Sequence, residues 1–342
     1  MANLSKIGGR WVNLDKPGGL VIFFYGGTVA HSEGITGGGL GGSDTHRGLD
    51  PEHPKLTIQD ALDDTTAGRG DTVVVLPGSI TVTAAITMTK DDVTLTGYTV
   101  TGPKTRNPSV VTTTTNSIAL IEVDAANCSV ENLTLTPAAS TADVYAIDVG
   151  DTTASPGTIL KNLFLDMESS VAAQNGIRIG DGTVVSDYCL IEGCFIYDYD
   201  DIGINVSTAS EGCVIRNCRI IDGVSANIGL TGINIAADHT AVENCFIKNS
   251  TAGASGACIE VASGAIENSI TDTHLIAFGS GGHGLHITAS GSVTATNIYV
   301  TASALAGAVD FDTAVTGLSG IIGWASAPAD GSISELINPN IA

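Results

Sequence analysis

The stretch Ile215-Arg216-Asn217-Cys218-Arg219-Ile220 decides the fold, because its pattern recurs along the chain: apolar, any, Asn-like, any, any, apolar. Clear copies are centred on Asn132, Asn162 and Asn244. Weaker copies are centred on Gly97, Gly193, Asp272 and Asn297. The steps between successive centres are 35, 30, 31, 24, 27, 28 and 25 residues. The chain is therefore a stack of repeats whose loops differ in length.

Each repeat also carries a second short strand pattern between the centres. Gly203-Ile204-Asn205-Val206 and Gly232-Ile233-Asn234-Ile235 alternate apolar and polar residues after a glycine. No amphipathic helix with a 3.6-residue period separates these strands, so the repeats are not βαβ units. The 42 glycines and the 5% aromatic content suit strands and tight turns. The sequence predicts an all-β fold, a parallel β-helix.

The repeat predicts columns of side chains that stack from coil to coil. Two positions before the centre and three positions after it, every copy has an apolar residue, so both columns are expected to face inward. The first of these columns comprises Leu95, Val130, Leu160, Ile191, Ile215, Val242, Ile270 and Ala295. The second comprises Val100, Leu135, Leu165, Ile196, Ile220, Ile247, Leu275 and Val300. The central Asn, Gly and Asp residues tolerate a left-handed backbone, which predicts a tight bend there.

Composition and charge disfavour several classes of partner. The 36 acidic residues outnumber the 14 Lys and Arg, giving a net charge of -22, which disfavours nucleic acid and anionic membranes as partners. The longest apolar run near the start, Leu20 to Tyr25, is far shorter than a membrane helix. The start lacks a signal-peptide pattern, so we expect synthesis in a host cytoplasm.

The start of the repeats resembles that of right-handed parallel β-helix proteins of the pectate-lyase-like class, especially phage spike and virion surface proteins. The residues that carry this resemblance are Gly48-Leu49-Asp50-Pro51, Leu56 to Leu62 and Gly70 to Gly78. The resemblance covers roughly residues 44–315 and implies a short capping helix near 57–63. It predicts an N-terminal arm at 1–43, a β-helix at 44–316 and a C-terminal cap at 317–342.

Acidic residues that follow the central strands are candidate functional groups. Asp198, Asp200, Asp201 and Asp222 belong to neighbouring coils and are interleaved with tyrosines. Paired carboxylates beside aromatic rings could bind sugar, hold calcium or serve an inverting glycosidase. Loops of an acidic solenoid are acidic by default, so a solvated loop edge is the alternative.

A second polar column faces outward from the other strand pattern. It comprises Glu122, Asp148, Arg178, Asn205, Asn234, Glu260, His286 and Asp310. Glu260 and Asp310 flank an imidazole and are weak catalytic candidates, because an exposed sheet needs polar residues there anyway. The basic cluster that a polysaccharide lyase would need for a uronate is missing, since the arginines fall in different columns. No metal site and no cofactor are predicted. Seven cysteines occur at coil spacing and are interpreted as small buried thiols.

The column two positions after the centre concentrates aromatic residues on the outside. It comprises Thr99, Thr134, Phe164, Phe195, Arg219, Phe246, His274 and Tyr299. An aromatic stripe outside a rod is a contact surface for sugar or for another subunit. Because the phage spikes that the chain resembles are homotrimers, Phe164, Phe195, Arg219, Phe246, His274 and Tyr299 are predicted to form a subunit interface.

The N-terminal arm has its own apolar cluster, formed by Trp11, Phe23, Phe24 and Tyr25. We interpret it as an anchor to other virion proteins. The leading hypothesis is a non-enzymatic phage virion protein, a trimeric β-helical spike or capsid-surface decoration. The alternatives are a tailspike that binds or cleaves a host surface glycan and a free secreted lyase.

Overall fold

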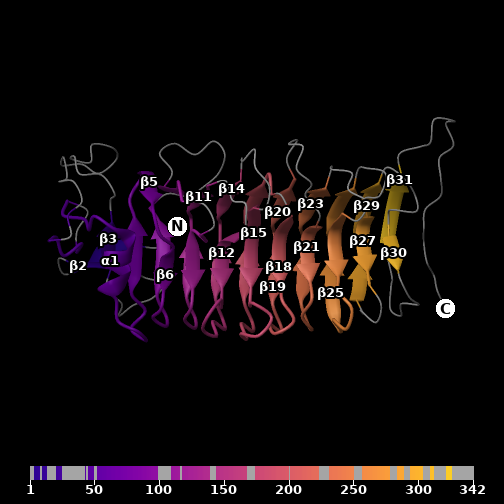
Figure 1. Cartoon of the computed structure of the whole chain (residues 1–342), viewed down its shortest axis with the longest axis horizontal. Helices are drawn as coiled ribbons and strands as arrows, with labels where there is room; N and C mark the ends of the chain where they lie inside the picture. The colour runs from indigo at the N-terminus through magenta and orange to yellow at the C-terminus, as the bar shows by residue number, and fades with distance from the viewer. Residues whose placement is uncertain are drawn as a thin grey trace.

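The computed structural model shows an elongated β-solenoid whose strands run across the long axis (Figure 1). The residues that it describes are 4–7, 10–13, 21–24, 43, 45–49, 52–98, 109–115, 118–138, 144–167, 174–199, 201–222, 231–249, 256–277, 283–288, 293–302, 309–311 and 321–325.

Each coil contributes one strand to each of three parallel sheets, which we name I, II and III in chain order. Sheet I has ten strands: β3 (Val21–Phe24), β4 (Thr72–Val75), β7 (Thr94–Gly97), β10 (Ser129–Glu131), β13 (Ile159–Lys161), β16 (Leu190–Glu192), β19 (Val214–Arg216), β22 (Ala241–Glu243), β25 (Asn268–Thr271) and β28 (Val293–Thr296).

Sheet II also has ten strands: β5 (Gly78–Val82), β8 (Ser109–Thr113), β11 (Thr134–Thr136), β14 (Phe164–Asp166), β17 (Phe195–Tyr197), β20 (Arg219–Ile221), β23 (Phe246–Asn249), β26 (His274–Ala277), β29 (Ile298–Ala302) and β31 (Ile321–Ala325). Sheet III has nine strands: β6 (Ile86–Met88), β9 (Ile121–Val123), β12 (Val144–Val149), β15 (Gln174–Ile179), β18 (Ile202–Val206), β21 (Thr231–Ile235), β24 (Ala257–Val261), β27 (His283–Ile287) and β30 (Val309–Phe311).

The predicted inward columns form the core of the rod. In sheet I, Leu95 to Ala295 are at most 1% exposed, and in sheet II the same holds from Leu135 to Val300. The prediction is wrong for the coil of Val100, because Val111 pairs with Leu135 at that position. Val100 and Thr99 lie outside the described residues.

The bend between sheets I and II is left-handed at seven of the eight predicted centres, with φ between 49° and 65°. Asparagine side chains stack there, as in the 2.7 Å hydrogen bond from Asn244 Nδ2 to Asn217 Oδ1. Gly97 is the exception, since its φ is not positive. A Cβ atom at Gly97 would lie 1.9 Å from the backbone oxygen of Asn132, so close packing of successive coils requires glycine there.

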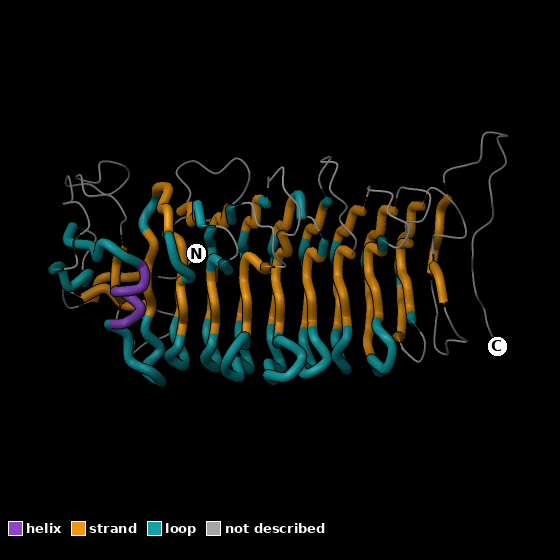
Figure 2. Tube along the Cα trace, in the orientation of Figure 1, coloured by secondary structure: helices purple, strands orange, loops and turns teal. Residues whose placement is uncertain are grey.

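A short helix closes the N-terminal end of the core, as Figure 2 shows. Helix α1 (Ile58–Asp63) begins at the N-cap Thr57, whose hydroxyl accepts a 3.1 Å hydrogen bond from Asp60 N. Ile58, Ala61 and Leu62 are buried against the first coil, so α1 covers apolar side chains that the solenoid end would otherwise expose.

Strands also occur in both flanking segments. The hairpin of β1 (Leu4–Ile7) and β2 (Arg10–Asn13) and strand β3 all lie in the predicted arm, and β3 pairs in parallel with β4. Strand β31 lies in the predicted cap and pairs with β29. Both pairings continue the solenoid's sheets beyond residues 44–316. Among the described residues, no helix is long and apolar enough to cross a membrane.

Candidate functional site

The outer face of sheet III carries the predicted polar column in continuous register. Strand pairing aligns it in the order Thr87, Glu122, Asp148, Arg178, Asn205, Asn234, Glu260, His286 and Asp310. The side chain of Asp310 lies outside the described part of the chain. Successive members stand on adjacent strands, about 4.8 Å apart. The column therefore presents a polar strip along the axis of the rod.

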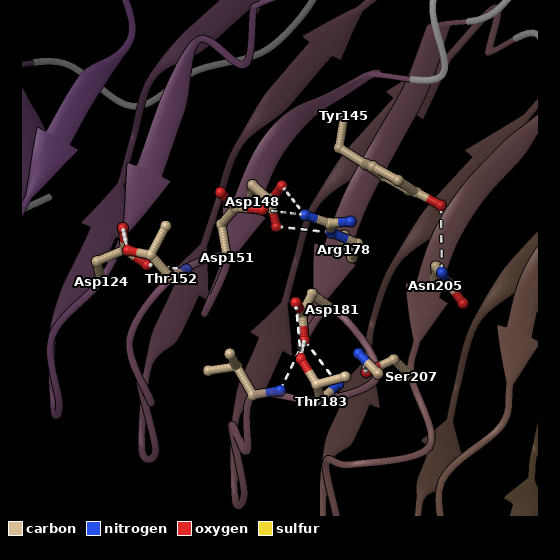
Figure 3. A network of polar contacts seen from close by, with 12 residues as sticks. Asp124, Tyr145, Asp148, Asp151, Thr152, Arg178, Asp181, Thr183, Asn205 and Ser207 are labelled. Carbon is tan, nitrogen blue, oxygen red and sulfur yellow. Dashed lines mark hydrogen bonds and ion pairs between the residues drawn. The ribbon is translucent and has the colours of Figure 1, made fainter.

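An ion-pair network lies in the middle of this strip (Figure 3). Arg178 donates from Nε to Asp148 Oδ1 at 2.8 Å and from a terminal nitrogen to Asp151 Oδ1 at 2.6 Å. Asp148 is 7% exposed. The arrangement holds one guanidinium between two carboxylates, so the cation is already compensated within the protein.

Burial shifts the titration of this network. Burial raises the pKa of Asp148, and this effect outweighs the lowering caused by the Arg178 hydrogen bond. Burial also raises the pKa of the neighbouring Glu122. For Arg178, burial alone would lower the pKa, but the hydrogen bond and charges of Asp148 and Asp151 raise it. The guanidinium therefore stays charged and paired, and it is not a free group for neutralising a uronate.

Neutral hydrogen-bonding groups continue the strip beyond Arg178. The ring of Tyr145 lies 5.4 Å from the Arg178 guanidinium carbon, and its hydroxyl oxygen accepts a 3.1 Å bond from Asn205 Nδ2. Asn234 Nδ2 donates to Asn205 Oδ1 at 2.9 Å. Tyr145 is only 7% exposed, so the half-buried amides of Asn205 and Asn234 are the neutral groups of this segment that a sugar hydroxyl could bind.

The other groups in Figure 3 belong to turns. Asp124 accepts from Thr152, and Asp181 accepts hydrogen bonds from the backbone and hydroxyl of Thr183. These turn hydrogen bonds lower the pKa of Asp181, the bond from Val184 N having the largest effect. Both aspartates fix the loops beside the strip.

The predicted aromatic column lies on the outer face of sheet II. Its register is continuous from Thr134 through Phe164, Phe195, Arg219, Phe246 and His274 to Tyr299. The ring centroids of Phe164 and Phe195 are 5.2 Å apart. Arg219 stacks between two rings, with its guanidinium carbon 5.4 Å from Phe195 and 5.2 Å from Phe246. Val110, not Thr99, pairs with Thr134 at the start of the column.

This column is open to solvent over part of its length. Tyr299 is 46% exposed, Arg219 is exposed, and Phe164, Phe195 and Phe246 are half-buried. The next outward positions in sheet II add Tyr197, Ile221 and Ile276. This second column also holds Asp166 and Lys248, so apolar side chains share it with charged ones, whereas an exposed sheet would ordinarily carry polar residues throughout.

Two of the four acidic candidates are buried and not part of a solvated loop edge. Asp198 and Asp222 follow neighbouring strands, and they are only 9% and 2% exposed. Asp201 is half-buried, and Asp200 lies outside the described residues. Asp198 has a φ of 60° and lies at a bend directly after β17, and burial leaves little of either carboxylate for a polysaccharide outside the rod.

The thiols and the remaining candidates have structural surroundings. All seven cysteines are free and buried, which confirms their interpretation as core thiols. Glu260 Oε2 accepts a 3.3 Å bond from Thr231, and the rings of His283 and His286 stack with centroids 5.2 Å apart. In the described part of the chain, no group of three or more His, Cys, Asp or Glu side chains is arranged to hold a metal ion. The side chains of the anchor candidates Trp11, Phe23, Phe24 and Tyr25 lie outside that part.

Sequence analysis missed a second left-handed column at the bend between sheets III and I. It comprises Asp92, Asn127, Gly157, Tyr188, Gly212, His239 and Glu267, all with positive φ. Tyr188, His239 and Glu267 rarely adopt this conformation, which is why residue type did not reveal the column. Tyr145 was also missed, although its position two residues before Ile147 in the same strand was a usable signal.

Comparison with known proteins agrees with this architecture. A family model for the right handed beta helix region matches residues 110–305. Since the match spans more than half of the 342 residues, the chain belongs to this family. No curated protein matches the sequence.

Solved structures share the fold at low identity. The pectate lyase Pel9A has a TM-score of 0.57 and 13% identity, over 92% of this chain and 81% of that chain. DFA-IIIase from Arthrobacter chlorophenolicus A6 has a TM-score of 0.50 and 11% identity, over 82% and 83%. ORF18 of Geobacillus virus E2 has a TM-score of 0.49 and 12% identity, over 97% and 69%. The likeness to Pel9A and to DFA-IIIase shows a shared β-helix fold.

Proposed function

We propose that this protein is a non-enzymatic structural component of a phage virion, a β-helical spike or capsid-surface decoration that works as a homotrimer. The phage assignment rests on the resemblance of residues 44–315 to β-helical spike proteins. The trimer rests on one observation, the aromatic and cationic column on the outer face of sheet II. The N-terminal arm then joins the rod to other virion proteins.

The sheet II column favours a protein partner over open solvent. Each half-buried aromatic ring that becomes fully covered contributes roughly 1 to 2 kcal/mol of hydrophobic free energy. Phe164, Phe195 and Phe246 stand on different strands, and a trimer repeats their burial three times. The chain carries a net charge of -22, so copies repel one another except where a face supplies cations such as Arg219.

Light scattering coupled to size-exclusion chromatography tests the trimer. The parent should have a mass of about 104 kDa, three times the 34.6 kDa chain. Phe195→Asp combined with Phe246→Asp places charge in the apolar column and should give a monomer with an unchanged circular dichroism spectrum. A parent that is monomeric at micromolar concentration would refute the trimer.

Particle imaging tests the location. Antibody against this chain should label the surface of purified particles. A variant that lacks residues 1–20 and carries Phe23→Ala, Phe24→Ala and Tyr25→Ala removes all four anchor candidates and keeps the β3 segment, so it should fold and fail to join particles. Labelling absent from intact particles, or full incorporation of the truncated rod, would contradict the assignment.

A second candidate function is glycan binding on sheet III. The observation that favours it is the neutral strip of Tyr145, Asn205 and Asn234 beside the compensated Arg178. Binding of host polysaccharide should then weaken in Asn205→Ala combined with Asn234→Ala. Depolymerisation of that polysaccharide by the parent, abolished by Glu260→Gln, would make the protein an enzyme instead.

A further inference from the structure

We propose that the trimer is heterologous: the outer face of sheet II in one copy packs against the outer face of sheet I in the next. The bends between these two sheets then point toward the three-fold axis. This inference rests on the proposed homotrimer and identifies the second surface that it requires. The occupant of each face is another copy of this chain.

Sheet I also carries outward apolar side chains on successive strands. Ile159, Leu190 and Val214 pair on successive strands and point outward. Ile159 is 36% exposed, whereas Leu190 and Val214 are half-buried. Beside them runs a charged column in which Glu192 binds Lys161 at 2.9 Å and Arg216 at 3.0 Å. Sheet I therefore has an apolar column and a charged column side by side.

The two faces adjoin at one corner of the rod. β10 ends at Glu131 and β11 begins at Thr134, so a two-residue bend separates sheet I from sheet II, and the same spacing recurs in later coils. A ring of three subunits requires two different faces on each subunit, one for each neighbour. Sheets I and II meet this requirement, and the polar sheet III is left facing outward.

The columns match in order of distance from that corner. Nearest the corner, sheet II carries Phe195 and Arg219, and sheet I carries the charged column that ends in the exposed Glu243. Farther from it, sheet II carries Tyr197 and Ile221, opposite Leu190 and Val214 of the neighbouring copy. Apolar columns therefore meet each other.

Charge matches across the same contact. The outward columns of sheet II carry two cations, Arg219 and Lys248, and one carboxylate, Asp166. The outward charged column of sheet I carries Glu131, Glu192 and Glu243 together with Lys161 and Arg216, and both of these cations pair with Glu192. In a chain with 14 Lys and Arg against 36 acidic residues, cations on one face and carboxylates on the other favour contact between unlike faces.

Mixing two defective subunits tests the heterologous contact. One variant carries Tyr197→Asp and Ile221→Asp on sheet II, and the other carries Leu190→Asp and Val214→Asp on sheet I. Each variant alone should be a monomer. Their equimolar mixture should form a heterodimer of about 69 kDa, twice the 34.6 kDa chain, because each supplies the face that the other lacks. A control with two charges on exposed turns after sheet III, Thr208→Asp and Ser263→Asp, should remain a trimer.

The outcomes separate this inference from the proposed function. A trimeric parent whose sheet I variant also stays trimeric would overturn the heterologous contact and leave the homotrimer standing. A monomeric parent would overturn both. Cysteine cross-linking tests the same contact without adding charge to either face. Ile221→Cys alone should give no dimer on a non-reducing gel. Ile221→Cys combined with Val214→Cys should give cross-linked dimers and trimers. A cross-linked dimer from Ile221→Cys alone would refute the arrangement.

Discussion

Replacing Asn244 by alanine and by glycine separates the two contributions of the asparagine column. Asn244 has φ of 49°, and its Nδ2 donates a 2.7 Å hydrogen bond to Asn217 Oδ1. Both variants lose that bond, which costs about 0.5 to 1.5 kcal/mol. Only alanine also strains the left-handed backbone, by roughly 1 to 2 kcal/mol. Asn244→Ala should therefore be destabilised by about 2 to 3 kcal/mol, and Asn244→Gly by about 1 kcal/mol.

Urea unfolding followed by circular dichroism measures the difference. Because solenoids can unfold in steps, the midpoint of the transition and the unfolding rate should both be compared. Thr294→Ala, an exposed strand position in sheet I, is the control and should change stability by less than about 0.5 kcal/mol. Equal midpoints for the alanine and glycine variants would show that left-handed geometry is not why asparagine occupies the bend.

Three further predictions concern other parts of the rod. Lys161, and then Arg216, hold the pKa of Glu192 below its usual 4.5, so Glu192 stabilises the fold above that pH and this contribution is lost as pH falls through the lowered value. Glu192→Gln should flatten the acid side of the melting-temperature curve, and an unchanged curve would contradict this. No described residue hydrogen-bonds the buried Tyr199 hydroxyl, so Tyr199→Phe should preserve stability or raise it by about 1 kcal/mol in urea unfolding, and a loss would contradict this. All seven thiols are buried, and burial raises the pKa of Cys258 to about 12, so a thiol reagent at about pH 8 should label only unfolded protein.

The repeat could be predicted because backbone geometry restricts residue type at the bend. Asn132, Asn162 and Asn217 tolerate positive φ, and the strands beside them must bury every second residue. The fixed two-residue bend then sets the register of both neighbouring strands. Burial, column order and the outward aromatic residues all follow from that register.

The prediction failed where the bend does not set the register. After Gly97 the next sheet II strand begins at Ser109, so Val110 takes the place assigned to Thr99. Asp198 and Asp222 could not be placed because each follows the last residue of its strand, where the strand period no longer sets side-chain direction, and Asp198 has a positive φ. The pairing of Arg178 with Asp151 depends on a turn after β12, whose path the strand period does not determine.

The three outer faces differ in chemistry because strand alternation points their side chains away from the core, so packing does not restrict the residue type at these positions. Sheet II concentrates rings around Arg219, sheet I places Leu190 and Val214 beside a salt-bridge column, and sheet III keeps hydrogen-bonding groups from Tyr145 to Asn234. In the proposed trimer, the outer faces of sheets I and II are buried against the two neighbouring copies. A glycan could then contact only sheet III. Substitutions on sheets I and II should therefore abolish the trimer, whereas substitutions on sheet III should weaken glycan binding and leave the trimer intact.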